Sequence, residues 1–216
     1  MARAAPSSPP FPTWLPFVPH RREPFPWLKP GIFIGGLAPL AYTLFRVSQG
    51  ELSANPIAQI ENELGLTALL FLVAALACTP ARALFHWTWP PRIRRELGLF
   101  AFFYASLHFL TYVMLDQFFD WNAIVADVIQ RPFITAGFAA LVLLVPLAWT
   151  STNGWVRKLG YQRWVRLHQL VYLAGALAAL HFIWRVKIDL SQPLVYAAII
   201  GALFAIRLGF WLRRRA

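Results

Sequence analysis

Six long apolar runs separated by short polar stretches dominate the pattern of the chain. Each run is close to the roughly 20 apolar residues that cross a hydrocarbon core of about 30 Å. The pattern therefore predicts an all-α integral membrane bundle of six transmembrane helices. The expected spans are residues 31–47, 64–80, 96–115, 132–149, 166–184 and 193–212.

Both ends of the chain differ from this pattern. Residues 1–30 are rich in proline, which blocks regular helix, and they lack the apolar core of a cleavable signal peptide. We expect an extended cytoplasmic arm there, a transmembrane domain over residues 31–212, and a basic tail over residues 213–216. Pro39 and Pro146 fall inside predicted spans, where neighbouring helices can satisfy the freed carbonyl groups, so we expect kinks at these positions.

Lysine and arginine residues are distributed unevenly between the two sides of the predicted bundle. Fifteen of the 20 lie before span one, between spans two and three, between spans four and five, or after span six, and four lie on the opposite side. Because basic loops resist translocation, this asymmetry predicts that both termini are cytoplasmic and that spans three and five run outward in parallel. The opposite loops collect most of the acidic residues, so we expect an acidic outer face.

Composition excludes several other classes of protein. Only 13% of the residues are charged and 58% are hydrophobic, whereas soluble domains carry about a quarter charged residues. The net charge of +11 does not indicate nucleic-acid binding, because the basic residues lie at the ends of apolar runs instead of forming one stripe. Cys78 is the only cysteine, which excludes an internal disulfide and a cysteine metal cluster.

Three histidines lie within the predicted spans, where an ionisable residue is costly and marks a functional site by default. At about 1.5 Å per residue, His108 lies about 20 Å beyond Arg95 and His181 about 22 Å beyond Arg166. The two histidines therefore share a level in the outer halves of parallel spans. Two such imidazoles are typical axial ligands of a b-type haem, although they could also be hydrogen-bonding residues between helices.

His168 lies near the cytoplasmic ends of the spans, about 20 Å from the level of His181. At the same level span three offers Arg94 and Arg95 but no histidine, so one bis-histidine haem is expected and a second is left open. His168 and His181 are 13 residues apart, so on an ideal helix their side chains would point about 140° away from each other. Both can still bind haem from one span if the two sites lie at different azimuths, or if the helix has a bend or a π-bulge.

The sequence contains no nucleotide-binding signature such as GxGxxG or a P-loop, and no HExxH zinc motif. No loop is long enough for a nucleotide-binding domain. Reducing equivalents are therefore expected from a separate donor.

Two stretches carry a family resemblance: RRELGLFAFFYASLHFLTY, at residues 94–112, and YQRWVRLHQLVYLAGALAALHFIW, at residues 161–184. They resemble the MsrQ (YedZ) haem subunits of the bacterial ferric-reductase-like transmembrane group, over residues 28–212. The resemblance implies that His108, His181 and His168 are the haem ligands. The wider group has two histidines on each of two helices, and this chain lacks the inner one on span three. This leaves open whether His168 binds a haem with Arg94 or water as the opposite ligand, or has another role.

The resemblance also implies partners and further cofactors. It implies an inner-membrane subunit that binds haem b and FMN and passes electrons to MsrP, a periplasmic molybdopterin enzyme that reduces methionine sulfoxide in oxidised proteins. The expected donor is a cytoplasmic flavin reductase or the quinol pool. Arg94, Arg95 and Arg166 are expected to bind haem propionates or a flavin phosphate. Terminal catalysis would belong to the partner.

Two other interpretations are consistent with the sequence. The first is a stand-alone ferric reductase or a quinol-linked cytochrome b. The second is a haem-free transporter or assembly factor that uses the buried histidines for proton or metal movement.

Overall fold

The computed structural model describes residues 25–213, so most of the predicted arm and the last three residues lie outside the described residues. Six helical segments in it are long and apolar enough to span a membrane, which confirms the predicted all-α fold class, and the described residues contain no strand. The helices are α1 (Leu28–Gln49), α2 (Pro56–Phe85), α3 (Pro90–Thr111), α4 (Trp121–Gln130), α5 (Pro132–Trp149), α6 (Asn153–Leu159), α7 (Tyr161–His168), α8 (Leu170–Arg185) and α9 (Ser191–Arg213).

Several helices begin at a residue that sequence chemistry favours. Proline stands at the first position of α2, α3 and α5, where its missing N–H is not needed and its fixed φ suits a helix. The Asn55 side chain caps α2 by accepting a hydrogen bond from the Ala58 N–H, and Asp120 caps α4 in the same way. The π-helix η1 (Tyr112–Asp116) extends α3, and α7 and α8 form one span interrupted at Gln169.

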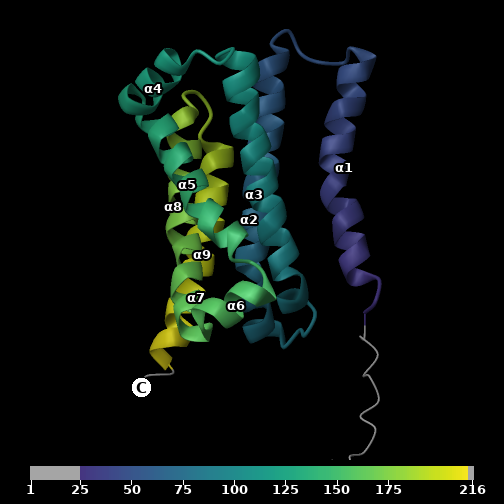
Figure 1. Cartoon of the computed structure of the whole chain (residues 1–216), viewed down its shortest axis with the longest axis vertical. Helices are drawn as coiled ribbons and strands as arrows, with labels where there is room; N and C mark the ends of the chain where they lie inside the picture. The colour runs from purple at the N-terminus through teal and green to yellow at the C-terminus, as the bar shows by residue number, and fades with distance from the viewer. Residues whose placement is uncertain (1–24, 214–216) are drawn as a thin grey trace, which may run out of the picture.

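Two helix pairs make the centre of the bundle: α2 packs most extensively on α3, and α5 on α8. Their shared core contains Leu72, Leu76, Ala101, Leu144, Leu147 and Ala174. Helix α9 covers α8 and α2, whereas α1 stands at the edge of the bundle (Figure 1). Four central helices therefore enclose one interior, and that interior is where a site can form.

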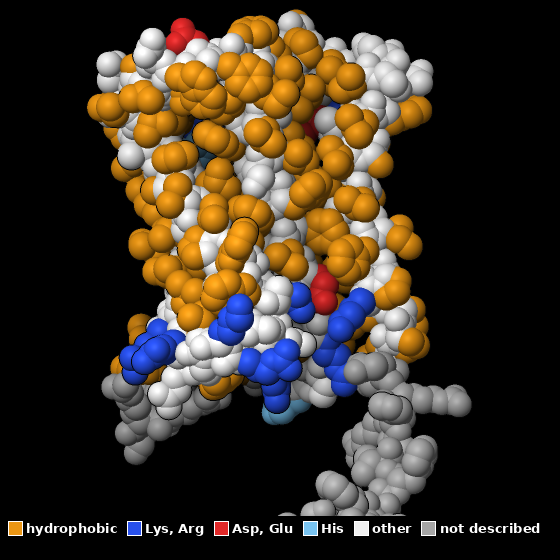
Figure 2. All heavy atoms as spheres, viewed as in Figure 1, with side chains coloured by type: hydrophobic (Ala, Val, Ile, Leu, Met, Phe, Trp, Pro, Cys, Tyr) orange, Lys and Arg blue, Asp and Glu red, His pale blue; other side chains and the backbone are white. Residues whose placement is uncertain are grey.

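The bundle has two ends that differ in charge, the α4 end and the basic end. The α4 end carries α4 and the loops that follow α1 and α8 (Figure 1). The basic end carries α6, α7 and the C-terminal end of α9, and Figure 2 shows Lys and Arg side chains gathered there beneath a broad hydrophobic band. A band of exposed apolar side chains bounded by charge is the surface expected of a multi-pass membrane protein, and we assign this class to the chain.

Helix α1 is held to the bundle at two places. Near Pro39, the Tyr104 hydroxyl of α3 donates to the Gly36 carbonyl (2.7 Å) and accepts from the Leu40 N–H (3.1 Å). The hydroxyl is thus inserted between the Gly36 carbonyl and the Leu40 N–H, which would bond to each other in a regular helix, next to a proline that also lacks its helical hydrogen bond. Gly36 leaves room for the Phe100 ring, because a Cβ atom at this position would collide with it.

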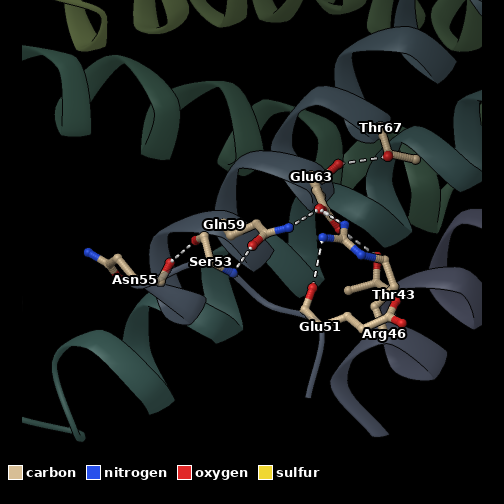
Figure 3. A network of polar contacts seen from close by, with 8 residues as sticks. All are labelled: Thr43, Arg46, Glu51, Ser53, Asn55, Gln59, Glu63 and Thr67. Atoms are coloured by element: carbon tan, nitrogen blue, oxygen red, sulfur yellow. Dashed lines mark hydrogen bonds and ion pairs between the residues drawn. The ribbon is translucent and has the colours of Figure 1, made fainter. Parts of the chain in front are cut away.

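The second attachment of α1 is a polar network at the α4 end (Figure 3). Glu63 of α2 accepts hydrogen bonds from Arg46 (2.7 Å), Thr43 (3.0 Å) and Gln59 (2.8 Å). Arg46 also donates to the backbone carbonyl of Glu51 (3.1 Å). One carboxylate therefore joins α1 to α2.

Arg207 of α9 compensates for a proline in α2. Pro80 has no N–H, so the Leu76 carbonyl four residues earlier loses its usual helical donor. The Arg207 guanidinium donates to this carbonyl (2.6 Å) and also to the Tyr172 hydroxyl. A neighbouring helix thus satisfies the freed group, as the membrane interior requires.

Candidate functional site

His108 of α3 and His181 of α8 face each other inside the four-helix centre. Their ring centroids are 6.1 Å apart and the ring planes cross at 73°. If the two rings bound one metal ion from opposite sides, each metal–nitrogen bond would be about 2 Å long, and each nitrogen lies about 1 Å from its ring centre. The ring centroids would then be about 6 Å apart, close to the observed distance. The pair expected from equal depth is therefore brought together at a distance that suits one shared metal.

The orientation of both rings is fixed by backbone carbonyl groups. Nδ1 of His108 lies 2.9 Å from the carbonyl oxygen of Glu61 in α2, and Nδ1 of His181 lies 2.7 Å from that of Phe133 in α5. A carbonyl only accepts, so each Nδ1 is the protonated nitrogen and donates to it. Each Nε2 then keeps its lone pair for a ligand, which is the usual outer-sphere arrangement of a metal-binding histidine.

A glycine lies beside each ring, four residues after the carbonyl that orients it. A Cβ atom at Gly65 would lie 3.2 Å from Nδ1 of His108, and one at Gly137 would lie 2.7 Å from Nδ1 of His181. The same three-part arrangement of carbonyl, glycine and histidine thus occurs twice, once between α2 and α3 and once between α5 and α8. Neither glycine was predicted from the sequence. A search for glycines in the spans that neighbour the two histidine-bearing spans would have found them.

The two histidines open onto a cavity of about 560 Å³, within the roughly 300–1,000 Å³ of small-molecule and cofactor sites. Toward the basic end it is lined by Leu72, Ala101, Leu144 and Ala174. Each of these lies seven residues, or two helical turns, from Gly65, His108, Gly137 or His181. The cavity is therefore a deep apolar slot with a pair of nitrogen ligands across it.

Bare metal binding does not explain the pair. Among the described residues, no group of three or more His, Cys, Asp and Glu side chains is arranged to hold a metal ion. Two nitrogen ligands and an apolar slot instead suit a metal that arrives with its own planar ligand, as in haem. The residues present fit such a group.

His168 lies apart from this cavity, near the basic end. The Thr150 hydroxyl donates its only proton to the Pro146 carbonyl (2.6 Å), so it accepts the hydrogen bond that links it to Nε2 of His168 (3.1 Å). The ring also packs on Trp164 with centroids 4.0 Å apart. His168 is thus held by Thr150 and Trp164. The helix assignment is interrupted at Gln169, directly after His168, so His168 and His181 lie in the separate segments α7 and α8.

The basic residues predicted to bind a cofactor lie at the same end of the bundle as His168. Arg94, Arg95 and Arg166 are all exposed, and none lines the cavity of His108 and His181. Arg94 contacts Thr79 of α2 through a 3.4 Å hydrogen bond. Their predicted role in cofactor binding therefore stays a prediction that concerns the basic end alone.

The arginines that do line the cavity were not predicted. Arg131 and Arg185 lie at its mouth at the α4 end, together with Glu61 and Asp116. Arg185 comes four residues after His181 and so shares its face of α8, a helical spacing that is visible in the sequence.

Fold and site together define a six-helix membrane protein with two facing histidines in a cofactor-sized slot. The model of the family described as ferric reductase like transmembrane component matches residues 63–179, which include His108 and most of α2, α3, α5 and α8 and end two residues before His181.

Curated relatives extend this match over most of the chain. Proteins named protein-methionine-sulfoxide reductase heme-binding subunit MsrQ share 55% identity in Rhodospirillum rubrum (85% of this chain, 88% of the relative) and 51% in Deinococcus radiodurans (88% and 93%). The protein of this name in Herminiimonas arsenicoxydans shares 48% identity over 85% of each chain. This chain belongs to the MsrQ family of ferric-reductase-like transmembrane proteins, which confirms the family resemblance of its sequence.

Proposed function

We propose that this chain binds one haem b between His108 and His181 and carries electrons across the inner membrane to a periplasmic methionine sulfoxide reductase. The observation that carries the proposal is the pair of imidazoles beside one cavity, with ring centroids 6.1 Å apart and with each Nδ1 bonded to a backbone carbonyl, which leaves each Nε2 free for a metal. The relatives' name, a heme-binding subunit of a methionine-sulfoxide reductase, supports the same cofactor and the same system.

The chain's own residues would provide the environment for this chemistry. Haem bound here supplies a one-electron ferric–ferrous couple. Glu61 and Phe133 hold the imidazoles through their carbonyl groups, and Gly65 and Gly137 give the rings room against α2 and α5. Leucine and alanine side chains keep water from the inner part of the slot.

The direction of transfer follows from the distribution of charge. Basic loops stay in the cytoplasm, so the basic end is the cytoplasmic side and the α4 end the periplasmic side. The histidines lie toward the α4 end, where MsrP, the molybdopterin partner, would dock. Asp189 is exposed there, and hydrogen bonds from the Ser191 side chain and backbone hold its pKa below the usual range. Such a carboxylate favours a partner with a basic surface.

Donor and additional cofactors complete the proposal. Electrons enter at the basic end from a cytoplasmic flavin reductase or from quinol, and FMN or a second haem would belong to that end, near His168, Arg94, Arg95 and Arg166. All three arginines are exposed at that end.

Vesicles reconstituted with the full chain test this relay. Flavin reductase with NADPH and flavin is supplied on the basic-end side, and oxidised MsrP is enclosed on the other. The wild type should reduce enclosed MsrP, and His108→Ala should abolish that transfer. The exposed-loop variant His86→Ala serves as a matched control for removal of a histidine and should transfer at the wild-type rate.

Two outcomes would contradict the proposal. One is reduction of MsrP only when donor and partner share one side of the membrane. The other is transfer by His108→Ala at the wild-type rate, which would show that the facing histidines carry no electrons.

A further inference from the structure

The lining of the cavity is polar at one end only. The walls that extend two helical turns toward the basic end are leucine and alanine. At the α4 end the lining also contains apolar side chains, among them Phe133, Ile134 and Val186, but all of its charged and amide side chains lie there: Glu61, Asn62, Asp116, Arg131, Arg185 and Gln192. A ligand with one charged edge and an otherwise apolar body therefore fits the cavity in one orientation.

Haem is such a ligand, because its two propionate carboxylates lie on the same edge of the macrocycle. Burying an ionised carboxylate among leucine and alanine side chains, without a partner, is strongly unfavourable. The same carboxylates at the α4 end would meet two guanidinium groups and two amides, which outnumber the two acidic side chains at that end. The apolar walls thus disfavour one orientation and the polar mouth favours the other.

Arg185 is the cation at the mouth that is best placed for this role. It is half-buried, it lies one helical turn beyond His181 on the same face, and it has no hydrogen bond or ion pair with any residue that the structure describes. Arg131 differs, because its side chain is 57% exposed and forms an ion pair with Asp127 (3.0 Å).

We infer that the propionate edge of the haem faces the α4 end and that the Arg185 guanidinium binds a propionate there. This inference rests on the haem site proposed above. Arginine suits the role, since its planar fork of donors matches a carboxylate in a bidentate contact. A fixed cation beside the haem also stabilises the ferrous form, which carries one negative charge more than the ferric form, so Arg185 raises the reduction potential.

Three variants of the full chain test this inference by haem retention and potentiometric titration, readouts separate from turnover. Arg185→Gln should lower the midpoint potential and, since a hydrogen bond to a charged group is lost, speed haem loss to an acceptor globin roughly tenfold or more. Arg185→Lys keeps the charge and should restore most of the potential. Lys187→Gln removes the same charge two residues away, at an exposed position outside the cavity lining, and should resemble the wild type.

Reconstitution with the dimethyl ester of haem tests the contact itself. With neutral ester groups in place of the propionates, Arg185→Gln and the wild type should lose the cofactor at the same rate. A persisting difference would overturn the proposed contact with the propionate.

Failure of this inference and failure of the haem site give different results. If the wild type binds haem at His108 and His181 but Arg185→Gln keeps its potential and haem retention, the inference alone is wrong. If the purified wild type shows no low-spin haem, the proposed function fails first.

Discussion

Gly137→Ala probes how closely helix α5 holds His181. A Cβ atom at this position would lie 2.7 Å from Nδ1 and 2.9 Å from Cε1 of the imidazole, whereas ordinary van der Waals contact begins at 3.4 Å. The ring must therefore withdraw by about 0.7 Å, the difference between 3.4 and 2.7 Å. Metal–ligand distances tolerate about 0.2 Å.

The withdrawal should weaken the site in two ways. It stretches the 2.7 Å hydrogen bond from Nδ1 to the Phe133 carbonyl, and it displaces Nε2 from its position for the metal. Loss of such an outer-sphere contact usually lowers metal affinity about 10–100-fold. We expect Gly137→Ala to release haem faster by that factor, measured as transfer to an acceptor globin and as loss of the low-spin absorption bands.

Two other glycines provide the graded comparison. Gly65→Ala would place its Cβ atom 3.2 Å from His108, only 0.2 Å short of the 3.4 Å limit, so its effect should be smaller. Gly201→Ala in α9 meets nothing within 4 Å and should release haem at the wild-type rate. Haem retention by Gly137→Ala equal to that of Gly201→Ala would refute the argument that this glycine positions the ligand.

Three further substitutions test other parts of the structure. His168→Ala should keep the low-spin spectrum of the haem between His108 and His181, because Nε2 of His168 bonds to Thr150 outside that cavity; loss of all haem in this variant would contradict the site assignment. Arg207→Gln should lower the free energy of unfolding in detergent micelles by about 1–3 kcal/mol, because it leaves the Leu76 carbonyl beside Pro80 without a full donor; the exposed Arg213→Gln in the last turn of α9 is its control. Tyr104→Phe should cost about 1 kcal/mol by removing the hydroxyl that joins α1 to α3, and a change no larger than that of the exposed Tyr42→Phe would contradict that attachment.

Much of the fold follows from one-dimensional signals. Apolar runs of membrane-spanning length predicted all six spans, and α5 begins and ends at the predicted residues 132 and 149. The other spans extend beyond their predicted bounds, because polar and charged residues such as Glu61 and Arg92 remain helical at the ends of the apolar runs. Depth along parallel helices was enough to pair His108 with His181, since a helix has a fixed rise per residue.

Features that depend on contact between helices could not be predicted from the sequence. Hydropathy carries no information on azimuth, so it gave no indication that Gly137 lies against His181 or that the Tyr104 hydroxyl enters the hydrogen-bond ladder of α1. Arg185 is one of the four basic residues that the charge rule counted on the side opposite the basic loops, whereas the structure places it at the mouth of the cavity. Position relative to a neighbouring helix decides these roles.

The central claim is that His108 and His181 are the axial ligands of one haem. The most direct test is the low-temperature EPR spectrum of the purified ferric protein, compared with His108→Ala and His181→Ala. The two ring planes cross at 73°, so the wild type should give a strongly anisotropic low-spin signal of the kind produced by near-perpendicular imidazoles. Both variants should lose this signal. A high-spin signal in the wild type, or a low-spin signal that survives unchanged in either variant, would contradict the claim.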